Sequence, residues 1–153
     1  MTSSTTRVRR VVSRLVDWVA EGPQVVELGT AMTTPDVAFS VLEPLLSDRP
    51  TEEFWCLLLD GRHCAIGVAQ ATVGTLTASL VHPREVFGPA VRMGAAAVVV
   101  AHNHPSGDPE PSSEDITVTR RLLEVGDLLG IPLLDHLVIG DGKFVSLRRR
   151  MGF

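Results

Sequence analysis

The sequence has 153 residues, of which 44% are hydrophobic and 21% are charged. These proportions are typical of one globular domain with its own core and argue against a disordered chain. The formal net charge of −4 argues against a dedicated nucleic-acid binder. Arginines nevertheless cluster at residues 7–14 and 148–150. We interpret these clusters as solvated ends of the chain, with DNA as the alternative partner.

Other broad classes are also excluded by the sequence. No apolar run reaches the roughly 18 residues that a membrane span requires. The arginines near the N-terminus are not followed by the apolar segment of a secretory signal. We interpret the two cysteines, Cys56 and Cys64, as free thiols, because nothing else indicates an oxidising compartment. A cytoplasmic protein is expected.

The chain begins with a predicted helix and a short strand. Residues 7–20 place apolar side chains at helical spacing, with arginines mostly on the other face, which predicts an amphipathic helix. The apolar run at 25–28 indicates a strand. Thr34 at an N-cap and Pro35 at the first helical position then predict a helix to about Leu46. The expected units are an N-terminal segment, 1–33, and one domain, 34–153.

A hairpin is predicted next, over residues 52–71, which read EEFWCLLLDGRHCAIGVAQA. The Asp-Gly pair at 60–61 suits a type I′ turn between two strands. A further apolar run at 75–81 precedes a helix that begins near Pro83. Since an interior proline costs about 3 kcal/mol, we expect Pro89 to kink or interrupt that helix.

The C-terminal half alternates strand, helix and strands. Residues 94–101, GAAAVVVA, are apolar on both alternating faces, as in a strand covered by helices on both sides. A helix is predicted over 113–129, and a final strand pair over 131–147 turns at 140–142. The chain therefore predicts a single α/β domain with a central sheet flanked by helices.

Two histidines follow the buried strand directly. His102 and His104 are two residues apart, so on a continuing strand their side chains leave the same face. The Pro/Gly-rich stretch 105–109 turns the chain, and Ser112 is then a natural N-cap with Asp115 at N3. Two imidazoles and one carboxylate make three protein ligands with a fourth position open, the arrangement of catalytic zinc.

A purely structural interpretation stays open at this point. Serine followed three residues later by an acid resembles a capping box, which explains Ser112 and Asp115 without a metal. Other metal hydrolases fit less well. A metallo-β-lactamase would need H-x-H-x-D-H, and a TIM-barrel amidohydrolase would need about 250 residues.

The same residues resemble the JAMM motif of JAB1/MPN metalloproteases. His102, His104, Ser112 and Asp115 match H-x-H, seven residues, then S-x-x-D. The phrases HNHPSGDPEPSSED, HPREVF and LLDHLVIG resemble the RadC branch, over roughly residues 34–147. The resemblance implies a JAB1/MPN-like, cytidine-deaminase-like domain with a mixed sheet. It also implies one Zn²⁺ per chain, held by the two histidines and the aspartate.

The resemblance further implies a catalytic glutamate at the start of a strand. Glu53, directly before Phe54, is our choice, and Glu52 is the adjacent competitor, since strand alternation lets only one face the site. Glu53 would accept and return the proton of the attacking water, and Ser112 would donate to the developing oxyanion. The implied activity is hydrolysis of a peptide or isopeptide bond in a peptide or protein conjugate.

Other polar residues carry weaker signals. Asp135 and His136 lie outside the ligand set and are expected to be structural, with His136 orienting a ligand imidazole. For Arg84 we favour packing at a helix start over contact with an anionic substrate. His63 and Cys64 are too isolated to predict a second metal site.

Two other functions remain as alternatives. Longer RadC-like proteins carry a helix-hairpin-helix segment that contacts DNA, and residues 1–33 lack its Gly-x-Gly hairpin, so the chain resembles a short stand-alone form. A DNA-associated repair or recombination factor is the first alternative, and it requires salt-sensitive DNA binding. A non-catalytic MPN-like scaffold is the second, although the ligand set of this chain is complete.

Overall fold

The computed structural model describes residues 28–74 and 81–153. The expected helix at 7–20 and nearly all of the expected strands at 25–28 and 75–81 lie outside the described residues. The described elements are α1 (Pro35–Leu46), β1 (Glu53–Leu59), β2 (Ala65–Val73), α2 (Pro83–Met93), β3 (Ala97–Asn103), α3 (Ser113–Leu129), β4 (Leu133–Gly140), β5 (Lys143–Ser146) and α4 (Leu147–Met151).

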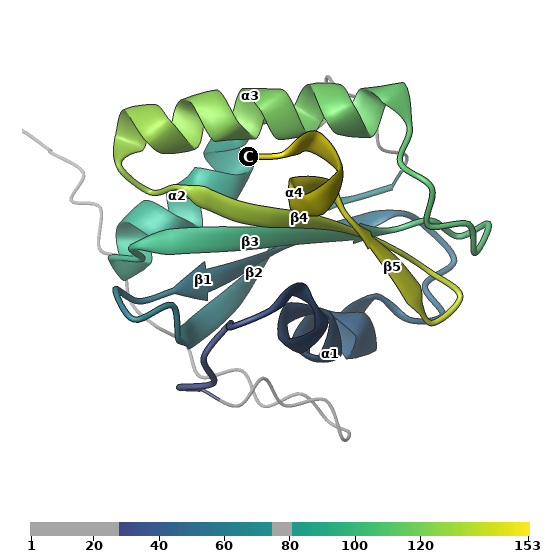
Figure 1. The fold of residues 1–153 in the computed structure, drawn as a ribbon, viewed down its shortest axis with the longest axis horizontal. Helices are drawn as coiled ribbons and strands as arrows, with labels where there is room; N and C mark the ends of the chain where they lie inside the picture. Colours follow the sequence, from purple (N-terminus) through teal and green to yellow (C-terminus); the bar gives the residue numbers. More distant parts are fainter. Residues whose placement is uncertain (1–27, 75–80) are drawn as a thin grey trace, which may run out of the picture.

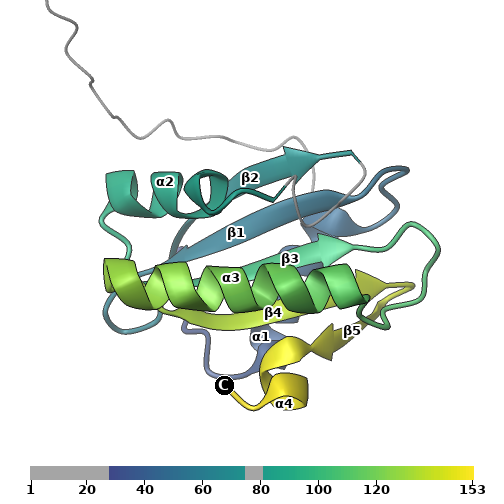
Figure 2. The same ribbon diagram turned by 90° about the horizontal axis from the view of Figure 1, so that it is seen from above.

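The strands form one five-stranded sheet in the order β2-β1-β3-β4-β5. β3 and β4 are parallel, and the other neighbouring pairs are antiparallel. Figures 1 and 2 show α1 against one face of this sheet and α2 and α3 across the other. The predicted α/β fold with a mixed sheet between helices is therefore confirmed. Among the described residues, no helix is both long and apolar enough to cross a membrane.

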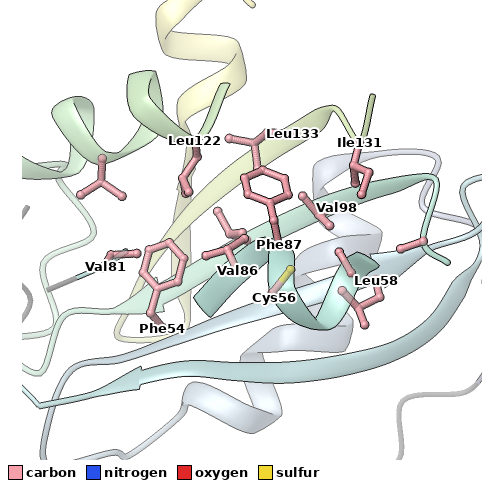
Figure 3. Close-up of a cluster of buried hydrophobic side chains, with 14 residues drawn as sticks. Phe54, Cys56, Leu58, Val81, Val86, Phe87, Val98, Leu122, Ile131 and Leu133 are labelled. Atoms are coloured by element: carbon pink, nitrogen blue, oxygen red, sulfur yellow. The ribbon is translucent and has the colours of Figure 1, made fainter. Parts of the chain in front are cut away.

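Every residue of β1 is buried, because helices cover both faces of the sheet. Alternate side chains of β1 therefore enter two different cores. Phe54 and Cys56 pack beneath α2 and α3, on what we call the α3 face (Figure 3). Trp55 and Leu57 pack against α1, on the α1 face. Both cysteines are free, as predicted, and burial raises the pKa of the Cys56 thiol.

The first hairpin forms as predicted, but its turn is not type I′. The Asp60 carboxylate accepts the backbone N–H groups of Arg62 and Cys64 at 2.8 and 2.9 Å, and His63 takes the left-handed conformation with φ +60°. This longer Asx-type turn replaces a two-residue turn because the aspartate side chain organises the backbone ahead of it. The turn at Asp141 and Gly142, by contrast, has positive φ at both residues, as a type I′ turn requires.

The interruption expected at Pro89 is absent. α2 runs from Pro83 to Met93 without a break, and Pro89 lies inside it. The helix buries Val86, Phe87 and Ala90 against the sheet, and this packing offsets the hydrogen bond that the proline cannot donate. Tertiary packing thus overrides the local preference. The short helix α4 was not predicted from the sequence.

Candidate metal centre

His102 lies near the carboxyl end of β3, on the α3 face of the sheet. His102 is opposite Phe54 in the β1–β3 register, and the two rings stack with centroids 5.8 Å apart. His104 follows the strand end, where its backbone N–H donates to the Ile139 carbonyl at 2.8 Å. The Nε2 atoms of the two imidazoles lie 3.1 Å apart. The strand spacing thus places both side chains at one point.

A tight loop returns the chain to that point. The Gly107 N–H donates to the His104 carbonyl at 2.9 Å, which closes the turn after β3. The loop lies so close to the end of β4 that a Cβ on Gly140 would lie 2.5 Å from the Gly107 carbonyl oxygen. Only glycine at 140 permits this approach. α3 therefore starts beside the two histidines.

The N-terminus of α3 holds its aspartate by a capping box. The Asp115 N–H donates to Ser112 Oγ at 3.1 Å, and the Ser112 N–H donates to Asp115 Oδ2 at 2.8 Å. The same carboxylate lies 3.1 Å from His102 Nε2 and 3.3 Å from His104 Nε2. Asp115 therefore takes part in the capping box and also lies beside both histidines, so the cap does not exclude a metal site.

The three side chains His102, His104 and Asp115, here called the His-His-Asp cluster, offer ligand atoms that all lie within 4.8 Å of one another. Across residues 28–74 and 81–153, no other group of three histidine, cysteine or acidic side chains could hold a metal. His102 and Asp115 are buried and His104 is half-buried. Two nitrogens and one carboxylate oxygen are a donor set that suits zinc and would accept several other first-row metals.

The protonation of the cluster follows from its geometry. Burial alone raises the pKa of Asp115, but the adjacent imidazoles and the hydrogen bond from the Ser112 N–H hold it well below its usual range. The hydrogen bond to Asp115 raises the pKa of His104 against the effect of burial, with further contributions from the Asp108 carbonyl and the charge of Glu52. These interactions favour the protonated form of His104 beside the Asp115 carboxylate.

Both imidazoles are also held from behind. His104 Nδ1 lies 2.7 Å from the Asp108 carbonyl oxygen, which only accepts, so Nδ1 carries the hydrogen. His102 Nδ1 lies 2.8 Å from Nε2 of the buried His136, so His136 contacts the His102 imidazole. Complete burial holds the pKa of His136 well below its usual value. Thr119, which the sequence analysis missed, contacts the far nitrogen of His136 at 2.7 Å.

The structure does not bring Glu53 to the cluster. Its carboxylate Oε2 accepts from Trp55 Nε1 at 3.0 Å and from Gln70 Nε2 at 2.9 Å, on the α1 face of the sheet. The choice of Glu53 is therefore corrected. The reason is strand alternation, since Glu53 shares its face with Trp55, whereas Phe54 and His102 face the other way.

Glu52 is the adjacent acid whose charge acts on the His-His-Asp cluster. It lies one residue before β1, is half-buried, and its charge contributes to the raised pKa of His104. The sequence analysis named Glu52 as the competitor but preferred the residue adjoining the apolar run. Alternation relative to Phe54, had it been applied with His102 in view, points to Glu52.

The other polar residues have structural partners. Asp135 accepts from the His136 N–H and from Ser146 Oγ, both at 2.7 Å. These contacts link β4 to β5, a structural role of the kind expected. Arg84 pairs with Glu85 at 3.0 Å at the start of α2. His63 lies in the Asp60 turn, away from the cluster.

The C-terminal arginine cluster is largely engaged within the domain. Arg150 pairs with Glu110 at 2.6 Å, Arg149 lies 3.5 Å from Asp36, and Arg148 donates to the Leu134 carbonyl. These contacts do not favour phosphate binding by that cluster. The arginines at 7–14 lie outside the described residues.

Comparison with known proteins finds a matching family model and several similar bacterial proteins. A family model described as RadC-like JAB domain matches residues 32–153. A UPF0758 protein of Geobacter sulfurreducens is 52% identical over 114 residues, which are 74% of this chain and 50% of that protein. A UPF0758 protein of Moorella thermoacetica is 56% identical over 116 residues, 75% of this chain and 50% of its own length. The chain thus spans about half the length of these relatives.

Proposed function

Because the chain belongs to the RadC-like JAB domain family, we propose that it is a metal-dependent hydrolase, specifically a zinc metallopeptidase or isopeptidase. The observation that carries the proposal is the convergence of the His-His-Asp cluster, and the charge of Glu52 acts on one of its members, His104. The proposed substrate is a peptide or a protein conjugate, whose amide carbonyl would be attacked by water. We also propose a cytoplasmic location, which the two free thiols support.

The donor set fits zinc. In neutral histidines whose Nδ1 is the donor, both Nε2 atoms offer lone pairs to the same point as the Asp115 carboxylate. Three acceptors within hydrogen-bonding distance of one another repel unless a cation or proton lies among them. When bound there, Zn²⁺ would acidify a water molecule and polarise the scissile carbonyl.

The chain's own residues would handle the proton and the developing charge. Glu52 is the proposed general base that takes a proton from the attacking water and delivers it to the leaving amine. Ser112 Oγ accepts the Asp115 N–H, and that hydrogen bond does not use the hydroxyl proton. We propose that this hydroxyl donates to the developing oxyanion of the substrate.

The first test is metal content by mass spectrometry on untagged protein. Wild type should retain about one zinc per chain, as a three-ligand catalytic site does. His104→Ala should lose it while circular dichroism shows a folded domain, and His63→Asn, outside the cluster, should keep it. Zinc-loaded protein is then screened against peptides and protein conjugates. Wild type without zinc after supplementation, or His104→Ala with zinc retained, would reject the metal site.

A further inference from the structure

We propose that Thr119 and His136 form a hydrogen-bond relay that sets the tautomer of His102, so that His102 presents the lone pair of Nε2 to the metal. Neither residue touches the ligand position, so both act as positioning residues. The inference rests on the proposed metal site for its function. The relay itself is a property of the protein without metal.

The direction of the relay follows from its far end. Thr119 Oγ1 lies 2.7 Å from the Asp115 backbone carbonyl oxygen, which only accepts, so the Thr119 hydroxyl donates there. Its oxygen then accepts from His136 Nδ1, also at 2.7 Å. A neutral imidazole has one donor and one acceptor, so His136 Nε2 is an acceptor.

The orientation then passes to the ligand. His136 Nε2 lies 2.8 Å from His102 Nδ1, which must therefore carry the hydrogen. His102 Nε2 is left with a lone pair, 3.1 Å from Asp115 Oδ1. The relay starts at the backbone carbonyl of Asp115 on α3 and ends at the side chain of His102 on β3. It therefore couples the position of α3 to the tautomer of His102.

Burial makes the relay necessary. His102, Thr119 and His136 each have no exposed surface, so water cannot replace a missing partner. Phe54 packs against both rings, stacked on His102 and edge-on to His136 with centroids 5.2 Å apart. This packing restricts rotation of the two rings. His104 differs, because the backbone carbonyl of Asp108 holds it directly.

Thr119→Val and Thr119→Ser form a matched pair for the test. Valine keeps the shape of threonine without the hydroxyl, and serine keeps the hydroxyl. The zinc dissociation constant, measured by competition with a chelator on protein shown to be folded, should rise about 10- to 100-fold in Thr119→Val. In Thr119→Ser it should stay close to wild type. Equal affinities in wild type and Thr119→Val, or an equal loss in both variants, would overturn the relay.

A second readout needs no metal. In metal-free protein at a pH where the imidazoles are neutral, nitrogen NMR of the histidine rings should show His102 protonated at Nδ1 in wild type and Thr119→Ser. Thr119→Val should populate the Nε2–H form. A wild type with His102 protonated at Nε2 would reject the relay, whereas the expected tautomer without zinc binding would reject only the metal site.

If Thr119→Val fails to fold, His136→Gln and His136→Met replace it. The two side chains have nearly the same shape, but only glutamine offers an oxygen to His102 Nδ1. His136→Gln should bind zinc more tightly than His136→Met, and equal binding would count against the relay.

Discussion

Two polar clusters lie on opposite faces of the sheet, near the start of β1 and the end of β3, and they differ in their balance of hydrogen-bond donors and acceptors. On the α1 face, the Glu53 carboxylate accepts from two donors, the Trp55 indole N–H and the Gln70 amide, and Arg49 Nε lies 3.9 Å from its other oxygen. On the α3 face, the His-His-Asp cluster directs two imidazole nitrogens and a carboxylate at one another. The acceptor of the first cluster finds its donors within the protein, so we call that cluster complete. The acceptors of the second cluster face one another, so we call it incomplete.

This difference separates a structural cluster from a site. A buried acceptor that faces donors contributes to stability, whereas acceptors that face one another cost free energy until a cation joins them. Burial of acids and histidines is therefore a poor marker of function here, and the balance of donors and acceptors is a better one.

The largest expected effect separates the two adjacent glutamates. Glu52→Gln should lower kcat/KM of the zinc-loaded enzyme on a cleavable substrate by about 10²- to 10⁴-fold, because it removes the proposed general base. Zinc content and thermal stability should stay close to wild type. Steady-state kinetics with metal analysis on the same samples makes the measurement.

Glu53→Gln is the matched control for that experiment, since it is the same substitution one residue along. It should leave kcat/KM close to wild type in folded protein. If Glu53→Gln were the variant that abolished turnover and Glu52→Gln remained active, the assignment of the two faces would be wrong.

Acidification should weaken zinc binding by the His-His-Asp cluster. Zinc must displace the proton on His104, whose pKa is raised, so the apparent zinc affinity should fall about tenfold per pH unit below that pKa. A chelator competition series from pH 8 down to about pH 5.5, spanning the usual histidine value, measures the slope. Affinity independent of pH over this range would contradict the coupling.

In the metal-free protein, the contribution of His104 to stability should change with pH in the opposite direction. The buried His136, whose pKa is lowered, contributes with the other sign in wild type and in the variant below, so the comparison of the two proteins isolates His104. The folded pKa of His104 lies above its unfolded value, so its contribution to stability is fully present below about pH 6.5 and is lost as pH rises through the folded pKa. Asp115→Asn should flatten this dependence, because the carboxylate is the first cause of the shift. Urea unfolding of both proteins at several pH values makes the comparison.

Much of the site was predictable because local rules determine it. The two-residue spacing of His102 and His104, and an N-cap serine with an acid at N3, depend only on strand and helix geometry. The register of the first strand was harder. Two adjacent glutamates precede the apolar run, and the hydrogen bond from the Trp55 indole to Glu53 is a contact that no periodicity reveals.

The contacts of Thr119 show the same limit of prediction from sequence. Thr119 follows Asp115 by four residues on α3, so its backbone contact to the Asp115 carbonyl is local. Its contact to His136 joins helix to sheet across seventeen residues of sequence, and only the packed structure supplies it. Likewise, both Asp-Gly pairs suggested tight turns, but the Asp60 side chain captured its own backbone and changed the first one.

A smaller effect, on stability, is expected from the Glu53 cluster on the α1 face. Glu53→Gln should lower the free energy of unfolding by about 1.5–3 kcal/mol, the range for hydrogen bonds to a charged group. Both donors bind the same oxygen, Oε2, so an amide oxygen can still accept from both, but these hydrogen bonds lose the strength that the charge gives them. The other oxygen, which lies 3.9 Å from Arg49 Nε, is replaced by an amide group that cannot pair with the guanidinium. Chemical denaturation of metal-free protein measures the loss. An unchanged unfolding free energy would mean that the Glu53 cluster adds no stability.

The smallest effect should come from the exposed donor of that cluster. Gln70→Met should cost less than about 1 kcal/mol, because water can replace the lost donor at the edge strand β2. Trp55→Phe should cost more, since the indole is buried and no water replaces its N–H at the Glu53 carboxylate. Denaturation of the two variants beside wild type ranks them. If Gln70→Met proved the more damaging, Glu53 would depend on solvent-exposed partners, and the contrast between a complete cluster and an incomplete one would lose its basis.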